Sequence, residues 1–223
     1  MNEKNSNQNY NKVLHLNDIL KSIRNVNQLI IREDNREKIA DSVCQLLVEN
    51  RGFEHAWMLL TDKEKNYQYS TAYSFQKGKI VIKNSLQNQA YPECVQQAFK
   101  SNKTILIKSK ECSVCGFLET SSENSGLVTA IAYKGRLYGV LVVYLLSEYA
   151  KDPEEQKLIS EIADDIAFAF FDIEQKEKNK IIEKKLMDSE TRLKNVFSNA
   201  PAGIFRTTFD GKAIEANQEM ARI

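Results

Sequence analysis

Apolar residues recur at helical spacing near the start of the chain. From Leu16 they stand three and four positions apart, which predicts a helix over residues 16–31 with the stripe of a coiled coil. Asp34 and Glu37 form a carboxylate variant of the capping box, so a second helix is expected over residues 35–50. Each helix has one apolar face and is predicted to pack against the core with it.

The strongest helix start in the chain lies at residues 152–155, where an Asp cap, a first-turn Pro and two Glu agree. This third helix is expected to bury a wide face over residues 152–173. Over residues 174–180 the apolar stripe disappears, although helix-favouring residues continue. The stripe resumes at Ile182, Leu186, Leu193 and Val196. Residues 174–198 are therefore predicted to form a solvated signalling helix with coiled-coil spacing.

Between these helices the apolar period changes from 3.6 to 2, which is typical of strands. Strands are expected at residues 53–61, 67–75, 104–107, 127–133 and 137–146. The last of them is apolar on both faces, so we expect it to be central in a sheet that is covered on both sides. The side chains expected on one of its faces are Tyr138, Val140, Val142 and Tyr144.

The predicted fold class is α+β, with a central antiparallel β-sheet of five or six strands. The three helices are expected on one face, and the connecting segment 76–126 on the other face, where a pocket would lie. A turn at Lys134 and Gly135 joins the last two strands of the sheet, with a positive φ at Gly135.

The two ends of the chain differ from this domain. Residues 1–15 are rich in Asn, Lys and Gln and are predicted to be a disordered lead-in. Residues 199–223 show a strand–turn–strand pattern around Asp210 and Gly211. Two short strands cannot bury a core alone, so we expect this segment to begin a second domain.

Composition narrows the function classes. A formal net charge of +1 with 27% charged residues gives no overall attraction to nucleic acid. The longest apolar run, residues 137–146, is about half of the ~20 residues that span a bilayer, and the polar start is no signal peptide. We therefore expect a cytoplasmic protein with no membrane span and no nucleic-acid partner. Four cysteines in 223 residues are too few for a disulfide scaffold.

Three stretches of the sequence resemble parts of a GAF sensory domain. They are RGFEHAWMLL at the first strand, YPECVQQAFKSNKTILI in the connecting segment, and GLVTAIAYKGRLYGVLVVYL before DPEEQKLISEIADDIAFAF. The resemblance covers roughly residues 16–173 and implies a ligand pocket on the connecting-segment side of the sheet. Family ligands include cyclic nucleotides, bilins, haem and small metabolites. The chain has neither the NKFDE-type set of cyclic-nucleotide binders nor the chromophore-region motif of bilin binders.

Residues 189–223 resemble the opening of a PAS domain. GIFRTTFDG matches that family's first strand and turn, and EANQEM matches its second strand and following helix, with an Asn at 217. The order GAF, signalling helix, PAS is common upstream of histidine kinases and cyclic-dinucleotide enzymes. The sequence shows no phosphoacceptor His block, no GGDEF-like or EAL-like motif and no nucleotide-binding Gly-rich loop. We expect the sensory part of a longer signalling protein, with no catalytic residues of its own.

Cys94, Cys112 and Cys115 are the most chemically suggestive residues. The CxxC spacing of the last two can chelate one Zn or Fe or close a redox disulfide. Cys94 begins a predicted short helix, and the resemblance implies that this helix and the CxxC loop both border the pocket. A metal or redox site, a haem site and unoccupied thiols all remain open. Cys44 is expected in the core, and His55 is more often structural than a ligand at such a position.

Aromatic residues near the connecting segment are candidates for lining a pocket. The candidate ligand-binding residues, with the three cysteines included, are Tyr73, Tyr91, Cys94, Cys112, Cys115 and Phe117. The alternative for each tyrosine is an ordinary place in the sheet.

The sequence therefore predicts the input module of a signal-transduction protein, most simply a sensor histidine kinase. It would bind a small ligand, a metal or a redox cue and relay it through a dimeric helix. The first and last helices are expected to form a parallel homodimer. The alternatives are a ligand-free GAF dimerisation scaffold and a thiol enzyme of the GAF-type methionine-sulfoxide reductase class.

Overall fold

The computed structural model describes most of the chain, and its described residues form two compact units. The described residues are 17, 21, 24–50, 53–80, 91–101, 103–108 and 123–222. One unit ends at Ile173 and the other begins at Glu174. The predicted lead-in at residues 1–15 lies outside the described residues.

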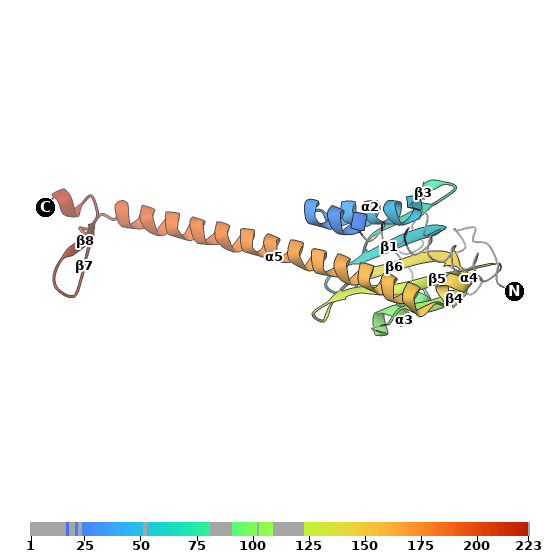
Figure 1. Ribbon diagram of the computed structural model, residues 1–223. Coiled ribbons are helices and arrows are strands. Elements are labelled where there is room, and N and C mark those ends of the chain that lie inside the picture. Colours follow the sequence, from blue (N-terminus) through green and yellow to red (C-terminus); the bar gives the residue numbers. More distant parts are fainter. Residues whose placement is uncertain are drawn as a thin grey trace. The chain divides into compact units, whose positions relative to one another are not determined.

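The first unit is built on a six-stranded sheet with the strand order β3-β2-β1-β6-β5-β4 (Figure 1). The strands are β1 (His55–Thr61), β2 (Tyr67–Ser74), β3 (Gly78–Ile80), β4 (Ile105–Lys108), β5 (Asn124–Tyr133) and β6 (Arg136–Leu146). Every neighbouring pair is antiparallel, so the predicted α+β class and the antiparallel sheet are confirmed. The short edge strand β3 lies in the connecting segment 76–126, where the sequence pattern predicts no strand before residue 104.

Helices lie on both sides of this sheet. They are α2 (Arg36–Glu49), α3 (Glu93–Lys100), α4 (Ser147–Ala150) and α5 (Pro153–Ser198), and residues 24–32 are also helical. The predicted capping box at Asp34 is displaced by one residue. Asn35 is the N-cap of α2, because its side-chain oxygen accepts a hydrogen bond from the Lys38 amide at 2.9 Å. At the start of α5, Asp152 accepts from the Glu154 amide at 3.1 Å, as the sequence pattern predicts.

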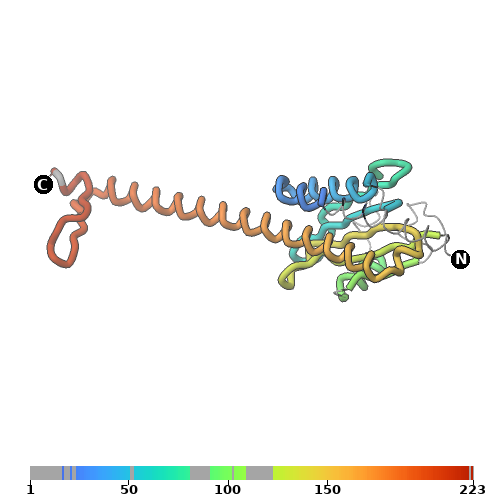
Figure 2. The backbone as a smooth tube through the Cα atoms, viewed as in Figure 1, coloured from blue at the N-terminus to red at the C-terminus, as the bar shows by residue number. Residues whose placement is uncertain are grey.

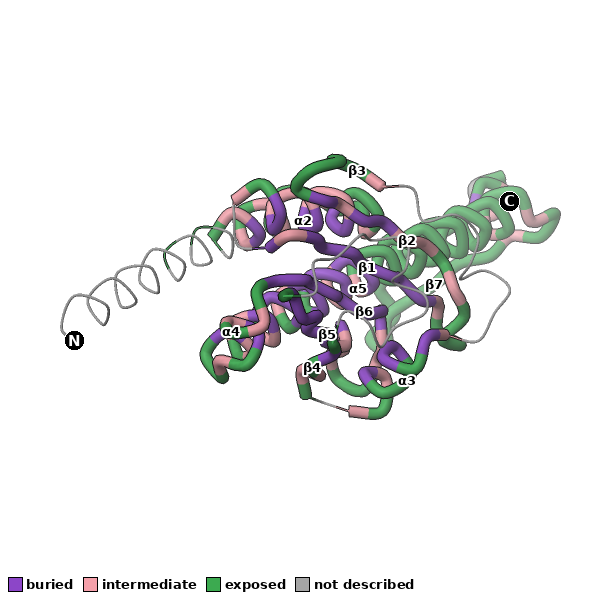
Figure 3. Tube along the Cα trace, turned by 90° about the vertical axis from the view of Figure 1, so that its right-hand side faces the viewer, coloured by how far each residue is buried: buried purple, intermediate pink, exposed green. Residues whose placement is uncertain are grey.

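The sheet is buried on both faces, by two separate clusters of side chains. On one face α2 and α5 pack against Met58, Leu127 and Leu141. On the other face α3 covers Trp57 and Val142. Each fully buried aliphatic or aromatic side chain contributes ~1.5–3 kcal/mol, so both layers are needed for a stable sheet. Figure 3 shows the buried residues gathered along the central strands.

The period-2 pattern predicts that Tyr138 shares a face with Val140 and Val142, and this prediction is wrong. Ile131 pairs with Gly139 while Ala132 pairs with Leu137, so Tyr138 is an extra residue in the ladder. The bulge turns its ring to the face of the sheet that α2 and α5 cover. There the ring packs edge-on against Phe170, with ring centroids 6.0 Å apart. Period-2 reasoning fails here because a bulge shifts the alternation by one.

The predicted turn between β5 and β6 is present. Lys134 has φ 49° and Gly135 has φ 77°, the left-handed pair that a tight two-residue hairpin turn requires. No atom lies within 4 Å of a Cβ added at Gly135, so this glycine is needed for its backbone angle and not for space.

Gly139 is needed for space. A Cβ built at this position would lie 2.0 Å from the Leu59 carbonyl oxygen of β1, and backbone cannot move aside as a flexible side chain can. The bulge beside Tyr138 therefore depends on a glycine that lets β1 and β6 approach closely.

We expect Gly139→Ala to lower the free energy of unfolding by at least ~2 kcal/mol, because the added methyl group overlaps a backbone oxygen. Urea denaturation followed by circular dichroism measures this. Gly135→Asn is the matched control on the same hairpin. Asn tolerates positive φ and meets no neighbour there, so the control should change stability by only about 0.5 kcal/mol. Equal stability of wild type and Gly139→Ala would contradict the close approach.

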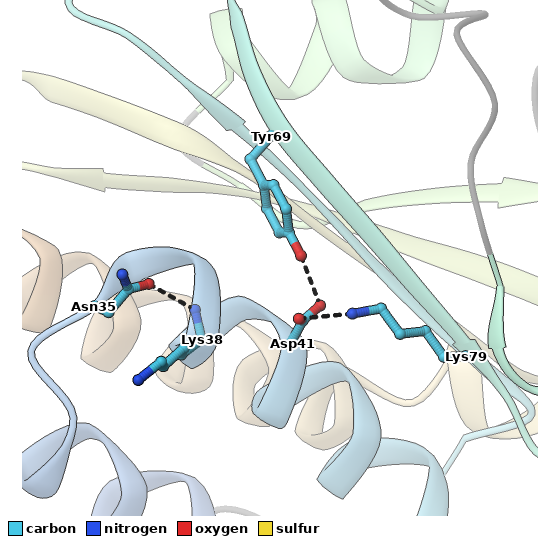
Figure 4. Close-up of polar contacts among 5 residues, drawn as sticks. All are labelled: Asn35, Lys38, Asp41, Tyr69 and Lys79. Atoms are coloured by element: carbon cyan, nitrogen blue, oxygen red, sulfur yellow. Dashed lines mark hydrogen bonds and ion pairs between the residues drawn. The ribbon is translucent and has the colours of Figure 1, made fainter.

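A polar contact joins α2 to the edge of the sheet (Figure 4). Asp41 of α2 accepts a hydrogen bond from the Tyr69 hydroxyl at 2.9 Å, and its second carboxylate oxygen lies 2.7 Å from the Lys79 ammonium. Burial alone raises the pKa of the Asp41 carboxyl, but the hydrogen bonds that it accepts, above all from Lys79, lower it below 3.8 overall. Burial and the bond to Asp41 raise the pKa of Tyr69 to about 12.

Asp41→Asn is expected to lower the free energy of unfolding at pH 7 by about 1 kcal/mol. Because the pKa of Asp41 is lower in the folded protein, its carboxylate stabilises the fold above pH 3.8. That contribution is lost as the pH falls through the folded pKa, so the two proteins should converge in acid. Denaturation between pH 3 and 7 measures the difference. Glu37→Gln, an exposed carboxylate on the same helix, should show no comparable convergence.

The second unit contains the later part of α5 and a small hairpin. α5 is a single helix of 46 residues, and Figure 2 traces its backbone. The hairpin consists of β7 (Phe205–Thr207) and β8 (Ala213–Ala216), followed by a short 3-10 helix (Met220–Arg222). Asn217 is 3% exposed and closes the hairpin. Its side chain accepts from the Ile204 amide at 2.8 Å and donates to the Ala202 carbonyl at 2.8 Å.

Across the described residues, the helices are too short or too polar for any of them to cross a membrane.

Candidate functional site

The face of the sheet under α3 is the candidate site, and α3 is shaped to cover it. Pro92 is the N-cap of the helix, and the acidic Glu93 in the first turn suits the helix dipole. Cys94, Val95 and Ala98 stand on its buried side at spacings of one and three, whereas its glutamines face outward. This face, which we call the α3-side face, comprises Trp57, Leu59, Ala72, Cys94, Val95, Ala98, Ile107, Val128, Val140, Val142 and Tyr144.

Trp57 places a polar atom inside this apolar layer. Its side chain is 1% exposed, and its indole Nε1 has no hydrogen-bond partner within the part of the chain that the structure describes. A buried N–H without an acceptor costs about 1–3 kcal/mol, so its presence needs a reason. An acceptor atom supplied by a ligand would satisfy it.

More polar groups stand at the same end of the sheet. His55 and Tyr144 are paired across β1 and β6, with ring centroids 6.2 Å apart in an edge-on contact. The Asn124 side-chain amide donates to the Glu54 carboxylate. His55 Nε2 lies 3.8 Å from Oε2 of the same Glu54 carboxylate. An imidazole, a phenol and a carboxylate therefore lie together beside the apolar α3-side face.

The chemistry that these groups support is recognition. They can donate and accept hydrogen bonds beside an apolar layer, and small-molecule sites gain orientation from polar groups of this kind. Within the described ranges, no three of His, Cys, Asp and Glu are grouped so as to hold a metal ion.

The candidate residues from the sequence fall in three places. Cys94 is 6% exposed and packs on the α3-side face. Tyr91 packs there too, but its hydroxyl donates to the Lys65 carbonyl at 2.8 Å, in the turn between β1 and β2. That turn is at the opposite end of β1 from His55. Tyr73 packs on the face of the sheet that α2 and α5 cover, so the structure separates it from Cys94. The remaining three candidates lie outside the described residues: Cys112, Cys115 and Phe117.

Cys44 lies in the core between α2 and the sheet. It is fully buried, and burial, with the nearby Asp41 charge, raises the pKa of its thiol well above the usual range. Such a thiol is inert, so Cys44 belongs to the packing of the domain.

Sequence reasoning missed Trp57, Glu54 and Asn124 as site residues. Trp57 had a signal, because it alternates with His55 on one face of β1. The contact between Glu54 and Asn124 joins positions 70 residues apart and has no sequence signal.

The comparisons with known proteins agree on one domain type. Residues 33–170 match the family model of the GAF domain. No curated protein matches the chain. The fold is similar to the GAF domain of nlh2 from A. aeolicus in an inactive state, at 12% identity and a TM-score of 0.53, over 70% of this chain and 97% of that one.

Two further solved structures share the fold. One is free methionine-R-sulfoxide reductase from Neisseria meningitidis in complex with its substrate, at 16% identity and a TM-score of 0.50, over 70% of this chain and 90% of that one. The other is the GAF domain of an Acinetobacter phosphoenolpyruvate-protein phosphotransferase, at 13% identity and a TM-score of 0.51, over 70% and 94%. At these identities the similarity establishes the fold alone. Because the family model spans more than half of the sequence, this chain belongs to the GAF domain family.

Proposed function

We propose that this GAF domain is the sensory input module of a signal-transduction protein. A small ligand or a metal on the α3-side face is its cue, and α5 is its output element. In this role the chain regulates and does not catalyse. In its finer form the protein is a cytoplasmic sensor histidine kinase in which residues 199–223 begin a PAS domain.

The observation that carries the proposal is the dual role of α5. Ile159, Ile166 and Phe170 have no exposed surface and form part of the domain core. Further along the same helix, Leu186 is 59% exposed and Leu193 is 67% exposed. Since one helix has both a buried and an exposed part, a change in core packing would also move the exposed part.

Ligand binding would reach α5 through the sheet. The α3-side face and the core under α2 and α5 share strands β1, β5 and β6. Alternate side chains of these strands belong to one cluster or the other. Interiors are close-packed, so a displaced side chain on one face strains the other. Binding and helix packing would then be coupled, as regulation requires.

The exposed part of α5 supports a homodimer. Its apolar residues Ile182, Leu186, Leu193 and Val196 are spaced by four, seven and three, which places them on one stripe. A single exposed helix gains little from such a stripe, whereas two parallel copies bury it between them. The proposed relay is therefore a parallel two-helix coiled coil.

The cue is tested on freshly purified protein by native mass spectrometry, absorbance spectroscopy and elemental analysis. We expect wild type to carry a bound small molecule or metal. If the cue is a metal held by thiolates, the variant Cys94→Ser/Cys112→Ser/Cys115→Ser should lose at least ~90% of it. Cys44→Ala, a core thiol, is the matched control and should keep it. A wild-type protein without adduct, metal or absorbance beyond its aromatic band would favour a ligand-free scaffold.

The relay is tested by light scattering coupled to size-exclusion chromatography. Wild type is expected to be a dimer, and Leu186→Glu/Leu193→Glu a monomer, because four buried carboxylates would face one another in the dimer. The matched control is Lys185→Gln/Arg192→Gln, which changes the net charge by the same amount at adjacent exposed positions. It should remain a dimer. A monomeric wild type at high concentration counts against the relay.

A further inference from the structure

A hollow of about 440 Å³ opens beside the C-terminal end of α3, at the edge of the sheet. It lies among α3, the hairpin of β5 and β6, and the first part of α5. The lining residues that matter here are Lys65, Phe99, Ser101, Lys134, Ser160 and Asp164. Its volume is within the range of ~300–1,000 Å³ that is usual for small-molecule sites.

The hollow exists because β4 covers only half of the β5 edge. Ile105–Lys108 of β4 pair with Ser125–Val128 of β5, and no described strand pairs with the rest of β5 on that side. One end of the opening is closed by polar contacts. The Thr104 hydroxyl lies 2.8 Å from the Thr129 hydroxyl and 3.3 Å from the Gln156 carbonyl of α5. The remaining walls come from α3, the β5–β6 hairpin, the first part of α5 and Lys65.

Charges of both signs line this hollow. Asp164 of α5 forms no ion pair among the described residues, and burial together with the charges of Asp165 and Glu161 raises the pKa of its carboxyl. Lys65 and Lys134 also form no ion pair there. The Lys134 ammonium rests against aromatic rings, 5.1 Å from the Phe171 centroid. One aspartate and two lysines, none of them in an ion pair among the described residues, thus line the same space.

We propose that this hollow binds a small zwitterion, a molecule of amino-acid size that carries one cationic nitrogen and one carboxylate. Asp164 accepts hydrogen bonds from the cationic nitrogen, and Lys134, with Lys65, pairs with the carboxylate. The hydroxyls of Ser101 and Ser160 complete the polar contacts, and Phe99 covers the carbon skeleton.

Such a ligand would join the hairpin tip to α5. Asp164 lies one helical turn before Phe168, whose ring packs edge-on against Tyr133 with centroids 5.5 Å apart. A zwitterion between Lys134 and Asp164 strengthens this same contact and holds the first part of α5 against the sheet. The site is therefore a second input to α5, separate from the α3-side face, and its existence does not require the first.

The test measures the binding of defined probes to the full chain by ¹H–¹⁵N chemical-shift titration and by the shift in melting temperature. The zwitterionic probes are glycine, L-alanine, L-serine, L-glutamate, L-lysine, β-alanine and glycine betaine, each up to about 10 mM. Acetate and methylammonium carry one of the two charges each. At least one zwitterion should shift the resonances of Lys134, Ser160 and Asp164 and bind at least ~10-fold more tightly than either single-charge probe.

Variants locate the binding. Asp164→Asn and Lys134→Gln should each weaken the zwitterion by ~10-fold or more. Asp165→Asn makes the same change at the next residue, which does not line the hollow, and should bind like wild type. Lys134 is on an exposed turn, so its variant remains informative if Asp164→Asn is unstable.

Three results would overturn the proposal: no zwitterion in the set binds wild type, acetate or methylammonium binds as tightly as the zwitterions, or both variants bind like wild type. None of these results bears on the adduct or metal expected at the α3-side face.

Discussion

The fold of the first unit depends on a strand that cannot face water on either side. Val140 and Val142 of β6 belong to one buried cluster, and Leu141 and Val143 belong to the other. A sheet with such a centre needs a layer on each face. The long helices supply one layer through their wide apolar stripes. The other layer includes the short helix α3, which covers less of the sheet, and this is the side where the polar groups of the candidate site and the open β5 edge are found.

Elements with strong and regular periodicity were predictable from the sequence. The strands β1 and β6 and the start of α5 fall where the apolar spacing places them, because each is specified by its own side chains. Local exceptions were not predictable. The bulge at Tyr138 arises from the close approach of Gly139 to Leu59 on another strand. The choice of Asn35 over Asp34 as the cap of α2 is decided by backbone geometry at one residue, and a composition pattern does not contain that information.

The site was less predictable than the fold, because its residues come together from distant parts of the chain. Cys94 could be placed, since a helix start beside the connecting segment has a local signature. Tyr73 could not, because a shift of one residue along β2 decides which face it joins. The pairing of Glu54 with Asn124 and the charged lining of the hollow bring together residues from separate elements. Such groupings follow from topology and have no trace in any single stretch of sequence.

The placement of Trp57 also has an optical consequence. It is the only tryptophan in the chain, and it stands on the α3-side face with 1% of its surface exposed. Its indole N–H has no hydrogen-bond partner among the residues that the structure describes. The emission wavelength of an indole depends on the polarity around it and on hydrogen bonding to its nitrogen. The intrinsic fluorescence of the whole chain under tryptophan-selective excitation therefore comes from one ring at the candidate site. The molecule carries a built-in chromophore that reports the state of that face without any label.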